Sequence, residues 1–249
     1  MKILLIKFLK KISRVIWFLT PVEFKPKTLL NPSGVTKLLH DKNDAETIEI
    51  LGDDLKNCKE FDDIWKLRLF AIEMAIANEK KLNLIDQTFF LEFGVWEGKS
   101  SNFFSKYIQH LYVFDSFEGL REEMVGMEPA GKFSLNKKLP RLRKNITPTI
   151  GWVEDTLENF LEEHQPMINF AHLDMDLYSP TKFTLQKIKP FLLDGAILLF
   201  DEFYNYLNWQ DGEYKALIEV FKKNEYKYVA YNIASGQLFI QISKEDAKI

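Results

Sequence analysis

The chain of 249 residues has little cysteine, little net charge and no long apolar run, and each deficit excludes a class of protein. Its single cysteine, Cys58, excludes an internal disulfide and a CxxC metal or redox motif, which is compatible with a reducing cytosol. The 33 basic and 36 acidic residues give a net charge of −3, too little positive charge for general nucleic-acid binding. We therefore expect a cytoplasmic protein that does not act on DNA or RNA.

Residues 1–22 form a basic segment without acids, in which apolar residues recur at helical spacing. This pattern predicts an amphipathic helix, because the apolar run 15–19 is too short for a signal peptide and lysines interrupt any bilayer-spanning stretch. Two interpretations stay open: the helix packs on the protein body or on a second subunit of a homo-oligomer, or it lies on the inner membrane surface. We favour packing, since a lone surface helix without a lipid anchor binds membranes weakly.

The remaining chain divides into a proline-containing linker with a helical cap, residues 23–87, and a larger domain, residues 88–249. Within the first of these, residues 35–78 have a helical pattern. In the larger domain short apolar runs alternate with helical segments, which predicts an α/β fold with a mostly parallel sheet and helices on both faces. Strands are expected at 88–93, 111–115, 149–153, 168–173, 196–200, 226–231 and 238–242. The short connector 232–237 joins the last two as a hairpin, so an antiparallel strand should close this Rossmann-like sheet.

Residues 91–101 follow the first expected strand with the sequence LEFGVWEGKSS, which is typical of a cofactor-binding turn. A helix is expected to follow over residues 99–109, with its positive N-terminal end toward the site. The spacing between Gly94 and Gly98 lacks the three-glycine pattern that accommodates a pyrophosphate. Asp115 ends the next strand, where an acid would accept hydrogen bonds from a ribose. Together the two features favour an adenosine-containing cofactor, but they do not distinguish a nicotinamide dinucleotide from S-adenosylmethionine.

Acidic residues follow two later strands, Asp174 and Asp176 after the fourth and Asp201 and Glu202 after the fifth. Strand ends of a parallel sheet meet at one edge, so these carboxylates should converge, and oxygen ligands suit Mg²⁺ or a similar cation. The alternative is that the acids cap helices, an interpretation that is strongest for Asp176 because Pro180 is expected to open a helix.

The ordered motifs resemble the macrocin O-methyltransferase family over residues 88–205. They are GVWxGxSS at 94–101, FDSFEGL at 114–120, GxxxDTL at 151–157, DxDLY at 174–178 and the Asp201-Glu202 pair. The resemblance implies a class I S-adenosylmethionine-dependent methyltransferase that methylates a sugar hydroxyl, with Mg²⁺ held by Asp174, Asp201 and Glu202. The chain departs from the family pattern at Glu202, where a second Asp is usual, at Asp194, where a Gly is usual, and at Arg121, where a Pro is usual.

Roles can be assigned to the residues of these motifs. The cofactor is expected to be held by Glu92, Gly94, Val95, Gly98, Ser100, Asp115, Ser116, Trp152 and Asp174. Asp174 is also expected to accept the proton of the attacking hydroxyl. His172 is the rival base, but it lies deeper in its strand, so we favour a core histidine there.

We expect a metal-assisted O-methyltransferase that acts on a glycan, a nucleotide-linked sugar or a glycosylated metabolite. A nicotinamide-dependent oxidoreductase and a non-catalytic cofactor-binding scaffold are the alternatives. The loop 121–145 is rich in Lys and Arg, which indicates either an anionic substrate or a solvated lid.

Overall fold

The computed structural model describes residues 34–124, 128–232 and 234–244. The chain forms two compact units, Met1–Lys42 and Asn43–Ile249, and helix α2 (Gly34–Leu55) begins in the first of them. The predicted helix over residues 1–22 lies outside the described residues. Among those residues no helix is long and apolar enough to cross a bilayer. The following description concerns the second unit.

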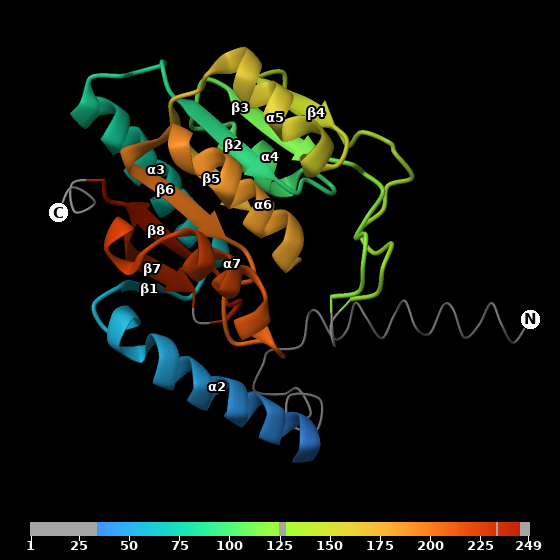
Figure 1. Cartoon of the computed structure of the whole chain (residues 1–249), viewed down its shortest axis with the longest axis vertical. Coiled ribbons are helices and arrows are strands. Elements are labelled where there is room, and N and C mark those ends of the chain that lie inside the picture. Colours follow the sequence, from blue (N-terminus) through green and yellow to red (C-terminus); the bar gives the residue numbers. More distant parts are fainter. Residues whose placement is uncertain (1–33, 125–127, 233, 245–249) are drawn as a thin grey trace, which may run out of the picture. The chain divides into compact units, whose positions relative to one another are not determined.

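An eight-stranded sheet with the order β1-β7-β8-β6-β5-β2-β3-β4 forms the centre of this unit (Figure 1). Its strands are β1 (Lys59–Phe61), β2 (Phe89–Phe93), β3 (Leu111–Asp115), β4 (Ile146–Ile150), β5 (Ile168–Leu173), β6 (Leu192–Phe200), β7 (Tyr226–Asn232) and β8 (Leu238–Ile242). Strand β8 pairs antiparallel with both β6 and β7, whereas the other pairings are parallel. The predicted mixed sheet with an antiparallel C-terminal hairpin is therefore confirmed.

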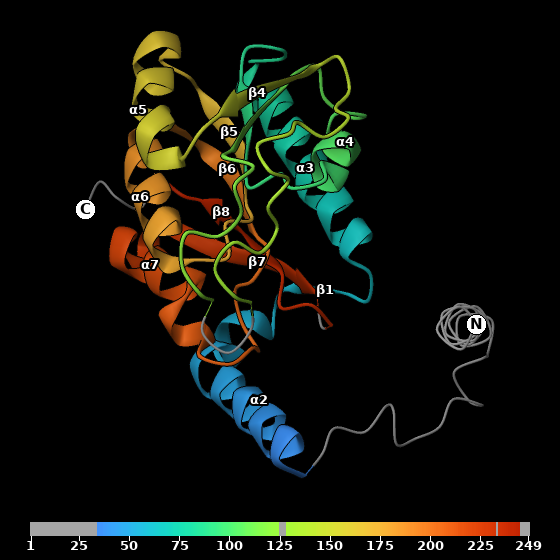
Figure 2. The same cartoon turned by 90° about the vertical axis from the view of Figure 1, so that its right-hand side faces the viewer.

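Helices cover both faces of the sheet, which is seen edge-on in Figure 2. Helices α3 (Ile64–Leu82) and α4 (Lys99–Phe104) lie on one face. Helices α5 (Val153–His164), α6 (Tyr178–Ile188) and α7 (Glu213–Val220) lie on the other. Helix α5 buries Val153, Leu157, Phe160 and Leu161, which recur at helical spacing and form its sheet-facing stripe.

The central strands are buried on both faces, as a parallel sheet between two helical layers requires. All six residues of β5 are buried. In β6, Leu198 and Phe200 belong to the core with α5 and α6, whereas Ile197 and Leu199 belong to the core with α3. The alternation sends successive side chains to opposite layers, so polar side chains can reach solvent only where these strands end.

Three local expectations were wrong. The strand expected at 149–153 is Ile146–Ile150, because the chain turns at Gly151 and helix α5 starts at Val153. The helix expected at 99–109 ends at Phe104. The helical stretch expected from 35 to 78 is interrupted by β1, whose three residues pair in parallel with β7. Strand β1 is short and polar and has no local apolar pattern, so its formation depends on pairing with the distant strand β7.

Candidate active site

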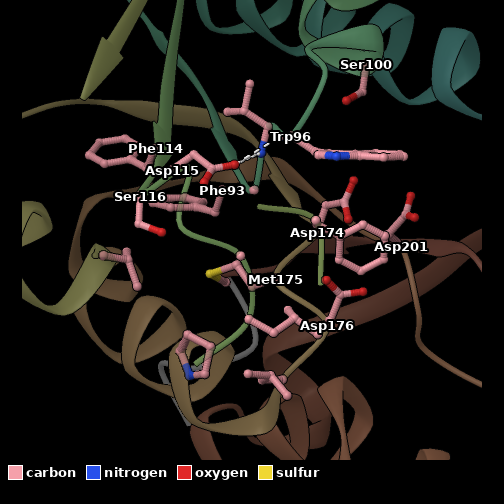
Figure 3. A pocket seen from close by; sticks show the side chains of 18 of the residues that line it. Phe93, Trp96, Ser100, Phe114, Asp115, Ser116, Asp174, Met175, Asp176 and Asp201 are labelled. Atoms are coloured by element: carbon pink, nitrogen blue, oxygen red, sulfur yellow. Dashed lines mark hydrogen bonds between the residues drawn. The ribbon is translucent and has the colours of Figure 1, made fainter. Parts of the chain in front are cut away.

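A cavity of about 590 Å³ opens at the carboxyl ends of β2, β3, β5 and β6. Figure 3 shows Asp115 and Ser116 on one side of this cavity and Asp174, Asp176 and Asp201 on the other. The two groups of residues that the sequence singled out, the cofactor turn and the acids, therefore line one space.

The turn after β2 passes so close to β5 that it requires glycine. Gly94 has φ +88°, and a Cβ atom there would lie 1.6 Å from the carbonyl oxygen of Asp174. The backbone is held in place because Gly94 N–H donates to Phe114 O at 2.9 Å and Asp174 N–H donates to Phe93 O at 2.8 Å. This approach brings the cofactor turn against the first acid of the cluster.

The carboxylate of Asp115 fastens the same turn to β3. One oxygen accepts hydrogen bonds from the backbone N–H groups of Val95 at 2.7 Å and Trp96 at 2.8 Å, and the other accepts from Phe117 N–H at 2.6 Å. Trp96 has φ +45° and projects beside the cavity, where its ring packs edge-on against Phe133 at 5.2 Å. Asp115 thus shapes the turn in addition to facing the cavity.

Most, but not all, of the residues expected to hold a cofactor reach the cavity wall. Those that line it are Gly94, Val95, Ser100, Asp115, Ser116, Trp152 and Asp174, and Glu92 and Gly98 are not among the lining residues. Glu92 is fully buried beneath the turn, where it accepts from Ser101 Oγ and lies 2.9 Å from His172 Nδ1. Through these contacts Glu92 connects the start of helix α4 to strand β5 beneath the cofactor turn.

Trp152 precedes α5 and lines the same cavity as the acids. The guanidinium of Arg121 lies 4.2 Å from the centre of the Trp152 ring, and it also pairs with Glu154 at 3.7 Å and Asp155 at 3.5 Å. Arg121 stands where the resembled family has a proline, so this chain adds a guanidinium, paired with two acids, to this wall of the cavity.

The acids after β5 and β6 form two overlapping sets, each with ligand atoms within 4.8 Å of one another. One set is Asp174, Asp176 and Glu202, and the other is His172, Asp174 and Asp201. All three acids expected to hold a metal belong to these sets, although neither set contains both Asp201 and Glu202, and Asp176 joins them. His172 is fully buried, as expected for a core histidine, but it also contacts Asp201 at 3.4 Å.

Arg68 of helix α3 also reaches this cluster, and sequence reasoning missed it. Its guanidinium forms an ion pair with Asp201 Oδ1, and Arg68 Nε donates to Gln237 Oε1 at 3.3 Å. Its side chain is only 7% exposed. An arginine in an amphipathic helix usually lies on the solvent face, so only the folded arrangement reveals this one.

Burial and mutual repulsion set the charges of the cluster. Burial, reinforced by the charge of Asp201, raises the pKa of Asp174 and of Glu202 well above the usual values, and raises that of Asp176 to about 7. Burial also opposes ionisation of Asp201, but His172 and Arg68 outweigh it and lower the Asp201 pKa to about 2. Burial lowers the pKa of His172, yet its hydrogen bonds to Asp201 and Glu92 prevail and raise it to about 9.

The donor set fits a hard divalent cation. Within the described residues no hydrogen bond or ion pair engages the carboxylates of Asp174, Asp176 or Glu202, and Glu202 Oε2 is buried without a partner. Glu213 lies behind them, fully buried, with Oε2 accepting from Glu202 N–H at 3.2 Å and Oε1 unpaired in the described structure. Carboxylates that crowd together without protein partners repel one another, and a bound cation removes that cost.

Fold and site together define a class: an α/β enzyme with a cofactor turn and an acidic cluster at the carboxyl ends of its strands. Residues 91–203 match a family model described as a methyltransferase domain. No curated protein matches the chain.

Two similar solved structures support the fold. A crystal structure of CalS11, described as a calicheamicin methyltransferase, has a TM-score of 0.54 and 20% identity, with 85% of this chain and 94% of that chain covered. An apo structure of CalS11, described as a TDP-rhamnose 3'-O-methyltransferase, has a TM-score of 0.53 and 18% identity, with 85% and 96% covered. The chain has the class I methyltransferase fold and is an S-adenosylmethionine-dependent methyltransferase.

Proposed function

We propose that this enzyme transfers a methyl group from S-adenosylmethionine to a sugar hydroxyl, assisted by a divalent cation such as Mg²⁺. The observation that carries the proposal is the placement of unpaired, partly buried acids directly beside the cofactor turn, in a single cavity. Residues 88–249 would form the catalytic domain, since the strands that build this cavity all lie within them.

The cofactor would lie along the turn after β2. Gly94, Val95 and Ser100 would border its methionine part, and Asp115 and Ser116, at the end of β3, would face its ribose. The ring of Trp152 would pack against the adenine. Glu92 would act from beneath by holding Ser101, the residue after Ser100 in α4.

Asp174 is the residue best placed to receive the acceptor's proton. It follows β5 directly, touches the cofactor turn through its backbone and leaves its carboxylate free of protein partners in the described structure. A cation held by Asp174 and Glu202 would stabilise the oxyanion of a hydroxyl that is too weak an acid to ionise near neutral pH. The remaining residues of the wall would align the hydroxyl with the methyl group and exclude water.

A sugar acceptor, and specifically a nucleotide-linked sugar, is supported by two observations. CalS11, whose fold is similar, is described as acting on TDP-rhamnose. In this chain Arg121 lines the same cavity with its side chain 45% exposed, so its guanidinium, although paired with Glu154 and Asp155, could also contact a phosphate of the acceptor. Arg141 and Arg143 line a separate groove beside α4, so we do not assign them to the acceptor.

The proposal can be tested by incubating the purified chain with S-adenosylmethionine and a panel of nucleotide-linked sugars and neutral glycosides. S-adenosylhomocysteine release and methylated product would be followed by mass spectrometry. We expect turnover of at least one nucleotide-linked sugar, its loss in excess EDTA and its recovery with Mg²⁺. Full activity in excess EDTA would contradict the role of the cation, and turnover confined to acceptors without a sugar would contradict the substrate class.

A further inference from the structure

Glu202 differs from its neighbours after β6 in how its backbone is held. The N–H groups of Asp201, Phe203 and Tyr204 donate to backbone carbonyl oxygens of other segments, at 3.0, 3.1 and 3.3 Å. Glu202 N–H donates instead to a side-chain oxygen, Glu213 Oε2, at 3.2 Å. The backbone position of this expected metal ligand therefore depends on one side chain, contributed by the first residue of α7.

Glu213 is a carboxylate in a place that disfavours one. Its side chain is fully buried at the start of α7, and its Oε1 atom has no hydrogen-bond partner in the described structure. Among the described residues its carboxylate makes one hydrogen bond, to Glu202 N–H, and no ion pair. Glu213 does not belong to the residues that line the cavity, so it does not touch a cofactor or an acceptor there. A buried acid with so few partners is costly, which points to a role in the site beside it.

The Glu202 side chain depends on a fixed backbone more than a shorter acid would. It has one methylene more than the Asp that is usual in the resembled family, and the added rotatable bond gives its carboxylate more positions. Its Oε2 atom is buried without a partner, so no protein hydrogen bond orients that oxygen. Groups that orient a metal ligand from outside the ligand shell commonly set the affinity for the metal. For Glu202, the hydrogen bond from its N–H to Glu213 is a contact of this kind.

We propose that Glu213 is a positioning residue of the cation site: by holding Glu202 N–H, it keeps the Glu202 carboxylate beside that of Asp174. The ligand atoms of these two acids lie within 4.8 Å of each other, which is the spacing that one shared cation needs. This inference rests on the proposed function for the existence of the cation, and it retains Asp174, Asp201 and Glu202 as the ligands. Because Glu213 lies outside residues 91–203, the methyltransferase domain match does not include it.

Two substitutions of similar size separate the hydrogen bond from the bulk of the Glu213 side chain. Glu213→Gln keeps an oxygen that can accept from Glu202 N–H, whereas Glu213→Met has none. Mn²⁺ binding to the metal-free protein is measured from the electron paramagnetic resonance of free Mn²⁺, without cofactor or acceptor. Glu213→Met should weaken Mn²⁺ binding about tenfold, because the ligand loses its support. Glu213→Gln should stay within about threefold of wild type, because the acceptor is kept.

A double-mutant cycle tests whether Glu213 acts through Glu202. Glu202→Gln removes the supported ligand and should itself weaken Mn²⁺ binding. In that background Glu213→Met should change the affinity by less than about twofold, because the group that Glu213 positions is already lost. Glu219→Met is the matched control, since Glu219 lies in the same helix but pairs with Lys182 at 2.6 Å. This control should leave Mn²⁺ binding unchanged.

Three results would overturn the inference while leaving the proposed function in place. These are an unchanged Mn²⁺ affinity in Glu213→Met, an equal loss of affinity in Glu213→Gln and Glu213→Met, or an undiminished effect of Glu213→Met in the Glu202→Gln background. Wild-type protein that binds no Mn²⁺ would overturn both the inference and the metal part of the proposed function. Thermal unfolding identifies any variant that fails to fold, and Glu213→Ala, which suits a helix, then replaces Glu213→Met.

Discussion

The polar residues at the two ends of strand β5 have different surroundings: Asn169, near its amino end, is paired with protein groups, whereas the two acids that follow its carboxyl end are not. Near its start, Asn169 Oδ1 accepts from Asn78 Nδ2 at 2.8 Å, and Asn169 Nδ2 donates to Ala75 O at 2.7 Å. Just beyond its end, the carboxylates of Asp174 and Asp176 have no partner within the described residues. Satisfied polar groups stabilise a fold, whereas unsatisfied ones persist where a ligand will satisfy them.

The two ends should therefore respond differently to substitution, and the largest effect is expected at the carboxyl end. Asp174→Asn removes the proposed base and a proposed ligand, so the turnover rate should fall by about 10³-fold or more. The stability of the metal-free protein should not fall, because the Asp174 carboxyl has no protein partner to lose and the change relieves its repulsion with Asp201 and Asp176. Steady-state kinetics with saturating cofactor measures the first effect and urea unfolding the second. A variant that keeps most of the wild-type turnover rate would remove Asp174 from the chemistry.

At the amino end the order of effects should be reversed. Asn78→Ala leaves Asn169 Oδ1 and the Asp194 carbonyl without their donor, which should lower the free energy of unfolding by about 1–3 kcal/mol. The turnover rate per folded molecule should not change, because these residues lie at the opposite end of the sheet from the cavity. Urea unfolding and kinetics on one preparation check both. A loss of turnover in fully folded Asn78→Ala protein would contradict the separation of a stabilising amino end from a catalytic carboxyl end.

The smallest expected effect concerns Glu79, a buried acid of the amino end that does have a partner. Burial raises the pKa of Glu79 above its usual 4.5, although the hydrogen bond from Thr88 opposes the shift. Because the folded pKa exceeds the unfolded one, this group's contribution to stability is present below pH 4.5 and is lost as pH rises through the folded pKa.

Glu79→Gln removes that titration and keeps an acceptor for Thr88. The variant should gain stability relative to wild type as pH rises from about 4.5 toward neutrality. Urea midpoints at a series of pH values measure the difference, with Lys80→Gln, a neighbouring surface change, as the control. A difference that is constant with pH would mean that Glu79 titrates normally in the folded protein.

The sequence was sufficient for the parts of the fold that depend on local pattern. Strands β3, β5 and β8 begin and end where the apolar runs predict, and the closing hairpin follows from a short connector. Strand β1 was missed because Lys59, Glu60 and Phe61 have no apolar alternation, and their pairing with β7 joins residues 171 positions apart. That pairing depends on the tertiary fold.

At the site, too, the sequence predicted only the features that depend on local pattern. Acids that follow strands could be placed together from the sequence, because parallel strands end at one edge of a sheet. Arg68 and Glu213 could not, since both lie in helices where a charged residue usually faces solvent. The helix positions alone cannot show that these side chains turn inward to the acidic cluster.

The most direct test of the contrast between the two ends is thermal unfolding of the metal-free protein with and without added Mg²⁺. If the unpaired acids form a cation site, saturating Mg²⁺ should raise the unfolding midpoint of the wild-type chain by about 5 °C or more. Asp174→Asn should lose most of that shift, and Asn78→Ala should keep it although its midpoint is lower. An unchanged wild-type midpoint, or an equal shift in Asp174→Asn, would contradict the account.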